Sequence, residues 1–149
     1  MVLRQRGFQE AKVRRLRAVL EHHRDFATPN ARPSPAGAIL RLAEDYVNVA
    51  RLYGGRVLRA DALGAMVKGG GTLYHPVLAQ VLVNTLGRHP PGTLLELEDG
   101  RYARVAAPPR GPESWDRPPA RLLDPRTRQP GAEVIELARG PRIRRAVPG

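Results

Sequence analysis

The chain has 149 residues, enough for one domain with a hydrophobic core or for a small domain with an additional element. It contains no cysteine, which excludes disulfides, thiolate metal ligands and cysteine nucleophiles. No apolar run approaches the roughly 18 residues of a membrane-spanning helix, and residues 1–9 lack the apolar segment of a signal peptide. We therefore expect a soluble, cytoplasmic protein with no membrane partner.

The formal net charge of +11 raises the question of nucleic-acid binding. Lys12 and Lys68 are the only lysines, and the other basic residues are arginines scattered from Arg4 to Arg145. Abundant arginine, alanine, proline and glycine are typical of a GC-rich genome, and the basic residues form no continuous stripe. We therefore do not expect nucleic acid to be the main partner, and a basic nucleic-acid-binding protein is kept as an alternative.

The first predicted helix covers residues 10–26. Val13, Leu16, Leu20 and His23 recur at the spacing of one helical face, and arginines occupy the other faces. An apolar helix face needs a cover. We therefore expect this helix to contact a protein partner or to form a homodimer with a second copy of the chain.

Three further helices are predicted from capping signals and apolar periodicity. Ser34 followed by Pro35 is typical of a helix start, with serine as N-cap and proline at the first helical position. Glycines that follow the apolar segments indicate where these helices end. The predicted helices cover residues 35–53, 60–68 and 76–86.

The periodicity changes beyond the prolines at residues 90–91. The pair Asp99-Gly100 supplies the positive φ that a tight turn needs, so a β-hairpin is predicted around it. The predicted strands cover residues 93–97, 101–106, 121–123 and 133–137. The segment that follows is basic, and we expect it to be mobile.

Together these elements predict a mainly α fold, in which a helical body precedes a small antiparallel β appendage. The chain divides into a helical region at residues 7–89, a small β subregion at residues 90–139 and a basic flexible tail at residues 140–149. No internal repeat is visible, so we expect one folding unit with two subregions.

Several segments occur in an order that points to a family. His22-His23 close the arginine-rich segment, and the segments that follow are ILRLAEDYVNVARLYGG, GGGTLYHPVLAQVLVNTLG and PPGTLLELEDGRYARV. This order resembles the C-terminal half of an HD-GYP domain, the class of phosphohydrolase that hydrolyses cyclic di-GMP. The similarity covers roughly residues 7–138, and its most specific stretches, residues 70–87 and 91–105, are structural rather than catalytic in that family.

The resemblance implies a metal site at His22, His23 and Glu44. In the family, histidines and acids hold two or three metal ions, which lower the pKa of a bound water and neutralise phosphodiester charge. The histidine pair maps onto His22-His23, and the acid of the following helix maps onto Glu44, where aspartate is usual. Without the resemblance, the two histidines are helix neighbours whose side chains diverge by about 100°, and Glu44 is a solvent-facing helix residue.

Other parts of the family's site have no counterpart here. The second acid falls at Val47, and the glutamate that usually follows the histidine pair is Arg24. The loop DFATPNARPSPAG lacks the glycine-tyrosine-proline signature. The histidine-aspartate pair of intact members lies upstream, and this chain begins after that point. Three ligands can hold one metal but cannot build a bridged site, so we expect an inactive homologue of a metal-dependent phosphodiesterase.

The leading hypothesis is a degenerate HD-GYP-type module in bacterial cyclic-dinucleotide signalling, which acts by binding a partner or a nucleotide. Arg56 and Arg59 lie where the family places a basic segment, and guanidinium groups suit the phosphates of a cyclic dinucleotide. A solvated surface is the simpler interpretation of these arginines. We expect no resident cofactor, and iron or manganese if a metal is retained. The alternative is a cyclic di-GMP phosphodiesterase completed by a missing upstream segment or by another chain.

Overall fold

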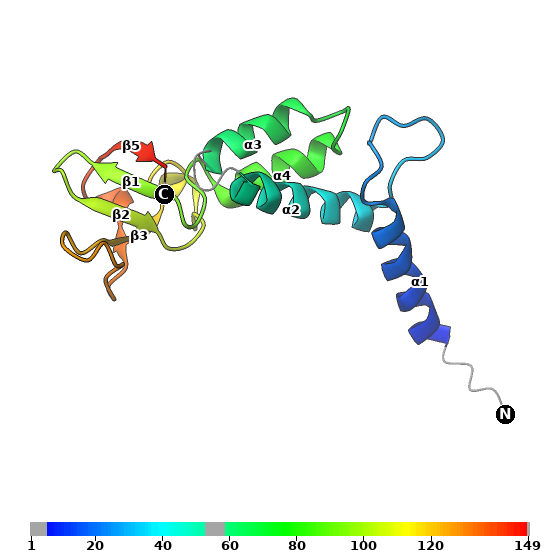
Figure 1. Ribbon diagram of the computed structural model, residues 1–149, viewed down its shortest axis with the longest axis horizontal. Helices are drawn as coiled ribbons and strands as arrows, with labels where there is room; N and C mark the ends of the chain where they lie inside the picture. The colour runs from blue at the N-terminus through cyan, green and yellow to red at the C-terminus, as the bar shows by residue number, and fades with distance from the viewer. Residues whose placement is uncertain (1–5, 53–58, 149) are drawn as a thin grey trace.

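The computed structural model describes residues 6–52 and 59–148. Its helices are α1 (Arg6–Glu21), α2 (Pro35–Leu52), α3 (Arg59–Lys68) and α4 (Pro76–Leu86). Its strands are β1 (Leu94–Leu97), β2 (Tyr102–Val105), β3 (Pro119–Leu122), β4 (Ile135–Glu136) and β5 (Ile143–Val147), with the short 3-10 turns η1 (Pro112–Ser114) and η2 (Leu137–Arg139). Helices α2, α3 and α4 pack together, α1 contacts α2 and extends away from α3 and α4, and the strands gather at the opposite end (Figure 1).

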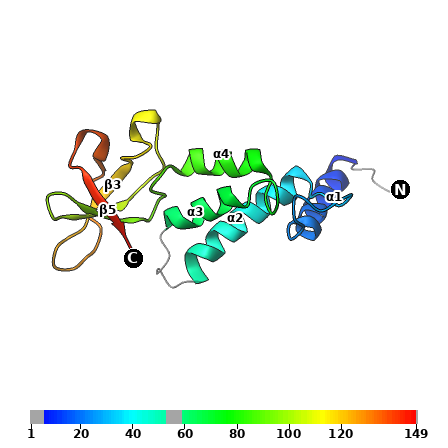
Figure 2. The ribbon, with the colours of Figure 1, turned by 90° about the horizontal axis from the view of Figure 1, so that it is seen from above.

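A small apolar core holds α2, α3 and α4 together. Leu42, Met66 and Ala79 are buried where the three helices meet. Partly buried side chains close this core at its edges, namely Tyr46, Tyr74, Leu78 and Leu82. Seen from above, the sheet lies beyond one end of these helices rather than over their faces (Figure 2). Within the described ranges, no helix has the length and apolar character needed to cross a bilayer.

The start of α2 follows the predicted capping signal. The Gly37 N–H donates to Ser34 Oγ at 3.3 Å, and Pro35 is the first residue of the helix. Glu21, the last residue of α1, accepts a hydrogen bond from the Ser34 N–H at 2.8 Å. One carboxylate therefore joins the end of α1 to the start of α2.

Glu21 should make the stability of the chain depend on pH. The Ser34 N–H, followed by Arg17, lowers the pKa of Glu21 from 4.5 to about 2. The folded state therefore binds fewer protons, so this stabilisation is complete above pH 4.5 and is lost as the pH falls through about 2. We expect Glu21→Gln to have a lower melting temperature than wild type at neutral pH, and the difference to shrink in acid, as measured by circular dichroism.

The matched control for this prediction is Glu10→Gln, which removes an exposed glutamate of the same helix that pairs with Arg14. Exposed ion pairs of this kind contribute little to stability. Its melting temperature should therefore follow that of wild type throughout the titration. Equal pH profiles for Glu21→Gln and wild type would contradict the assigned role of Glu21.

The strands form one antiparallel sheet in the order β4-β3-β2-β1-β5. The β1–β2 turn contains Gly100 at φ 83°, as the Asp-Gly pair predicted, and its N–H donates to Leu97 O at 3.0 Å. The sheet has a core of its own, separate from that of the helices. The buried members of that core are Leu95, Leu97, Ala103, Val105, Ala120 and Leu137.

The predicted mainly α fold is wrong. The structure is a mixed fold, because the five-stranded sheet is a body with its own buried core rather than a small appendage. The prediction of a flexible tail over residues 140–149 is also wrong at residues 143–147, which form β5 and pair with β1. Arg144 and Arg145 interrupt the apolar alternation of β5, so periodicity alone does not reveal this strand.

Candidate metal centre

His22 and His23 lie in the turn that follows α1, not inside the helix. α1 ends at Glu21, so the predicted helix over residues 10–26 is too long at its C-terminal end. The angle of about 100° between successive helical side chains therefore does not apply to the two histidines. Their ring centroids are 3.8 Å apart, with the planes tilted by 40°. The expectation that these side chains diverge is wrong.

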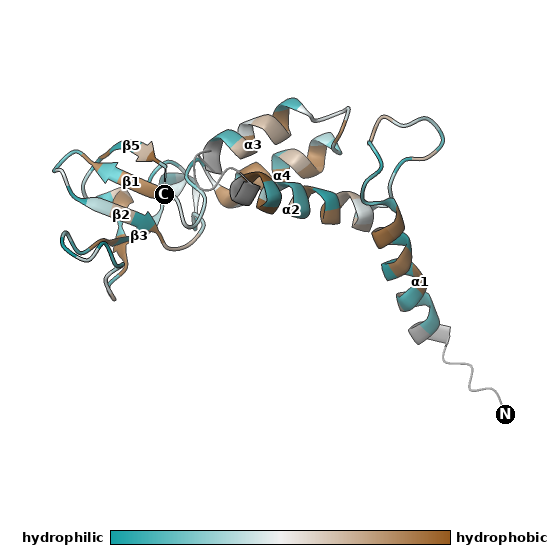
Figure 3. Ribbon diagram, in the orientation of Figure 1, coloured by the Kyte–Doolittle hydropathy of each residue, from teal (hydrophilic) through white to brown (hydrophobic). Residues whose placement is uncertain are grey.

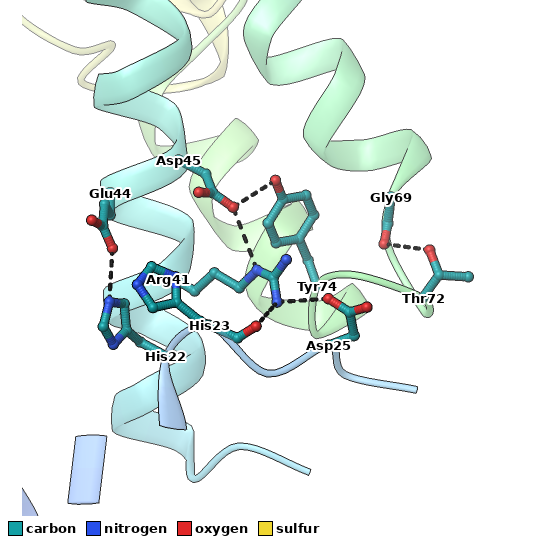
Figure 4. Close-up of polar contacts among 9 residues, drawn as sticks. All are labelled: His22, His23, Asp25, Arg41, Glu44, Asp45, Gly69, Thr72 and Tyr74. Carbon is teal, nitrogen blue, oxygen red and sulfur yellow. Dashed lines mark hydrogen bonds and ion pairs between the residues drawn. The ribbon is translucent and has the colours of Figure 1, made fainter. Parts of the chain in front are cut away.

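The structure brings together the three residues to which the family resemblance assigned metal ligands. His22, His23 and Glu44 each offer one ligand atom, and these atoms all lie within 4.8 Å of one another. Glu44 faces His22 from α2 (Figure 4), with Oε2 lying 3.0 Å from His22 Nε2. The side chain of His22 is 14% exposed and that of Glu44 is 39% exposed. The cluster is therefore anchored in the fold at His22 and open to solvent at Glu44.

The hydrogen bond on the other ring nitrogen of His22 suits metal binding. His22 Nδ1 lies 2.6 Å from Val19 O, which can only accept a proton, so Nδ1 must donate. Nε2 faces Glu44 Oε2 at 3.0 Å, so a metal ion would bind at Nε2 in place of this contact. Histidine ligands in metalloproteins commonly donate their second N–H to a carbonyl in this way. Two imidazoles and one carboxylate fit a single iron, manganese or zinc ion with open coordination positions.

Arg41 of α2 fixes the turn that carries His23. Its Nη1 donates to His23 O at 3.0 Å and to Asp25 Oδ1 at 2.8 Å (Figure 4). Its Nε also donates to Asp45 Oδ2 at 3.4 Å. The Arg41 side chain is 15% exposed, whereas that of its partner Asp25 is 51% exposed. Arg41 is a positioning residue that sequence reasoning missed, because its partners at residues 23 and 25 are distant in the sequence.

Asp45 belongs to a different network from Glu44. The Tyr74 hydroxyl donates to Asp45 Oδ2 at 2.9 Å, and the Arg41 guanidinium lies 5.6 Å from the centre of the Tyr74 ring. Burial, followed by the hydrogen bond to Asp45, raises the pKa of Tyr74 to about 12, so the hydroxyl keeps its proton at neutral pH. The two neighbouring acids of α2 therefore have different roles. Glu44 faces the histidines, and Asp45 links α2 to the loop before α4 through the Tyr74 hydroxyl.

The cluster does not extend to a bridged metal site. Asp25 pairs with Arg41, and Asp45 is shared between Arg41 and Tyr74, so both nearby aspartates already have cationic or hydroxyl partners. In the part of the chain that the structure describes, His22, His23 and Glu44 form the one group of three ligand-type residues close enough to share an ion. The arrangement suits one metal ion.

The structure does not test the two arginines that were predicted to bind a ligand. Arg56 lies outside the described residues, and Arg59 is described as the first residue of α3. Their contact with a cyclic dinucleotide stays a prediction. No family model, no curated protein and no solved structure matches this chain. The resemblance to the HD-GYP family therefore also stays a prediction.

Proposed function

We propose that this chain is a degenerate HD-GYP-type module of bacterial cyclic-dinucleotide signalling, which holds one divalent metal ion and acts by binding a partner instead of by catalysis. The observation that carries the proposal is the convergence of His22, His23 and Glu44, which come from the turn after α1 and the middle of α2. These are the positions to which the resemblance assigns metal ligands. Their meeting in space is an observation independent of the sequence motif.

The donor set supports binding without phosphodiester hydrolysis. A bridged pair of ions needs additional carboxylates to offset its charge and to hold both ions. Glu44 is the one carboxylate of the cluster, and the nearby Asp25 and Asp45 are engaged by Arg41. A bound ion would polarise a single water or phosphate oxygen. Iron or manganese suits a site of two histidines and one carboxylate.

The apolar face of α1 supports a role in partner binding. Val13, Leu16 and Leu20 are 62%, 63% and 77% exposed. Apolar and charged positions alternate along this projecting helix (Figure 3). Contiguous exposed apolar side chains mark contact surfaces in many proteins. The occupant of this face is a protein partner or a second copy of the chain.

Metal analysis of the purified chain tests the proposal. After loading with iron or manganese and dialysis, we expect about one ion per chain, and at least about a tenfold lower affinity in the double variant His22→Ala, His23→Ala. The matched control is His89→Ala, because His89 lies outside the cluster. Circular dichroism checks that each variant remains folded, and light scattering of the wild type distinguishes a homodimer from a chain that requires another protein.

Two results would contradict the proposal in different ways. A wild-type chain that holds no iron, manganese or zinc above the level of the double variant would remove the metal site. Metal-dependent hydrolysis of cyclic di-GMP by the wild type would contradict the non-catalytic role and would favour the phosphodiesterase alternative. Full metal occupancy without turnover is the expected outcome.

A further inference from the structure

A basic cavity lies at the sheet, where the connector after α4, the segment before β3 and the strand β5 meet. Its volume is about 640 Å³, within the range of small-molecule sites. Five arginines line it, against two carboxylates at Glu98 and Asp116. The basic residues of the lining are Arg88, His89, Arg117, Arg142, Arg144 and Arg145. The lining of the cavity therefore carries a net charge more positive than +1.

Glu96 holds two of these arginines in place. Arg144 Nη1 donates to Glu96 Oε1 at 3.0 Å, and Arg145 Nε donates to Glu96 Oε2 at 2.7 Å. The hydrogen bond from Arg145 lowers the pKa of Glu96, and the charges of Arg145 and Arg144 lower it further. The carboxylate is therefore ionised at neutral pH. A guanidinium carries five N–H donors, and each of these two contacts with Glu96 uses one of them. Both side chains are about two-thirds exposed, so their other donors remain available to a ligand.

Other polar groups of the lining have atoms without a partner within the described residues. Arg142 makes no side-chain hydrogen bond or ion pair there, although it stands among acids and arginines. Arg117 Nε and His89 Nδ1 are buried without a hydrogen-bond partner. Burial lowers the pKa of His89, so this ring is neutral at neutral pH. Buried polar atoms without partners are uncommon in folded proteins and indicate a water or ligand position.

We propose that this cavity binds a compact anion with several phosphate groups. Guanidinium groups bind phosphate oxygens through paired N–H donors, and several arginines converge here from separate segments. An excess of more than one positive charge favours a ligand with more than one negative charge. The concave shape favours a compact ligand over the extended backbone of a nucleic acid.

The cavity is separate from the metal centre. The residues that line it lie between Arg88 and Ala146, at the sheet end of the molecule, whereas His22 and Glu44 lie where α1 meets α2 (Figure 1). The proposal therefore does not depend on the proposed metal binding. Loss of metal in the double histidine variant should leave anion binding unchanged.

Titration with inorganic triphosphate at low ionic strength tests the proposal. Calorimetry should give one saturable site per chain, and the fluorescence of Trp115, the only tryptophan, should change because the Arg88 N–H donates to its carbonyl at 3.2 Å. Arg142→Ala should weaken binding about tenfold, as expected for the loss of a charge-assisted contact. The matched control Arg126→Ala removes an exposed arginine between β3 and β4 and should change the affinity less than about twofold.

A second variant in the lining of the cavity checks that the loss of affinity is not limited to Arg142. Arg88→Ala removes only an exposed pair with Asp116 at 3.4 Å, so it should fold normally and also weaken triphosphate binding. Equal weakening by Arg126→Ala and Arg142→Ala would overturn the proposal, because it would indicate general attraction to a basic protein. Absence of saturable triphosphate binding would overturn it as well. Binding of single-stranded DNA that triphosphate does not compete away would replace it with a nucleic-acid surface.

Discussion

Deletion of residues 142–149 is expected to lower the free energy of unfolding by at least about 3 kcal/mol, or to prevent the sheet from folding. This deletion removes β5, which pairs with β1 from Leu94↔Val147 to Leu97↔Ile143. It also removes the apolar cover that Ile143 and Ala146 give to the sheet core. Urea unfolding followed by circular dichroism measures the effect.

The control deletion removes only residues 148–149, which lie beyond β5. It should leave the urea midpoint unchanged, because it breaks no strand pairing. If the longer deletion were as stable as the control, the segment would behave as the flexible tail that its composition suggested. That result would contradict the pairing of β5 with β1.

The change Leu137→Ala should cost about 3–4 kcal/mol of folding free energy. Leu137 lies in η2, is 0% exposed and belongs to the sheet core, so the shorter side chain leaves a cavity that rigid strands cannot fill. The matched control is Val134→Ala, three residues earlier, where the side chain is 41% exposed and the cost should stay below about 0.5 kcal/mol. Urea midpoints and slopes give both values. A cost below about 1 kcal/mol for Leu137→Ala would show that η2 does not seal this core.

Elements with strong local signals were predicted well from the sequence. The helix 76–86 has the predicted bounds, with Pro76 at its start and Gly87 at φ 73° after its end. The start of α2 and the β1–β2 hairpin also follow their capping and turn residues, Ser34 and Gly100. In each case, the residues that determine the backbone conformation are neighbours in the sequence, so a local pattern is sufficient.

Elements that depend on distant partners were predicted poorly. β5 forms because β1, almost fifty residues earlier, offers it an edge, and the arginines in β5 conceal its apolar alternation. α1 ends at Glu21, and the carboxylate of Glu21 accepts a hydrogen bond from the N–H of Ser34, which lies thirteen residues later in the sequence. The predicted fold class was wrong for the same reason, because the last strand makes the sheet a full structural unit.

The candidate site was predictable in its residues but not in its geometry. His22, His23 and Glu44 followed from the family resemblance, and their ligand atoms meet within 4.8 Å. The close, tilted arrangement of the two rings could not be predicted without knowing where α1 ends. The role of Arg41 depends on its hydrogen bond to the backbone carbonyl of His23. The pattern of side chains in the sequence does not predict a contact of this kind.

The pairing of β5 with β1 sets an order of events during synthesis of the chain. Helices α2–α4 have all their core partners by residue 86 and can pack while translation continues. β1 emerges next but cannot obtain its neighbour on one side until residue 147 has left the ribosome. Through that interval β1 presents an unpaired strand edge, the kind of surface that associates with other strands. The nascent chain should therefore depend most on chaperones, or on slow dilution during refolding, after the helices have formed and before β5 is added.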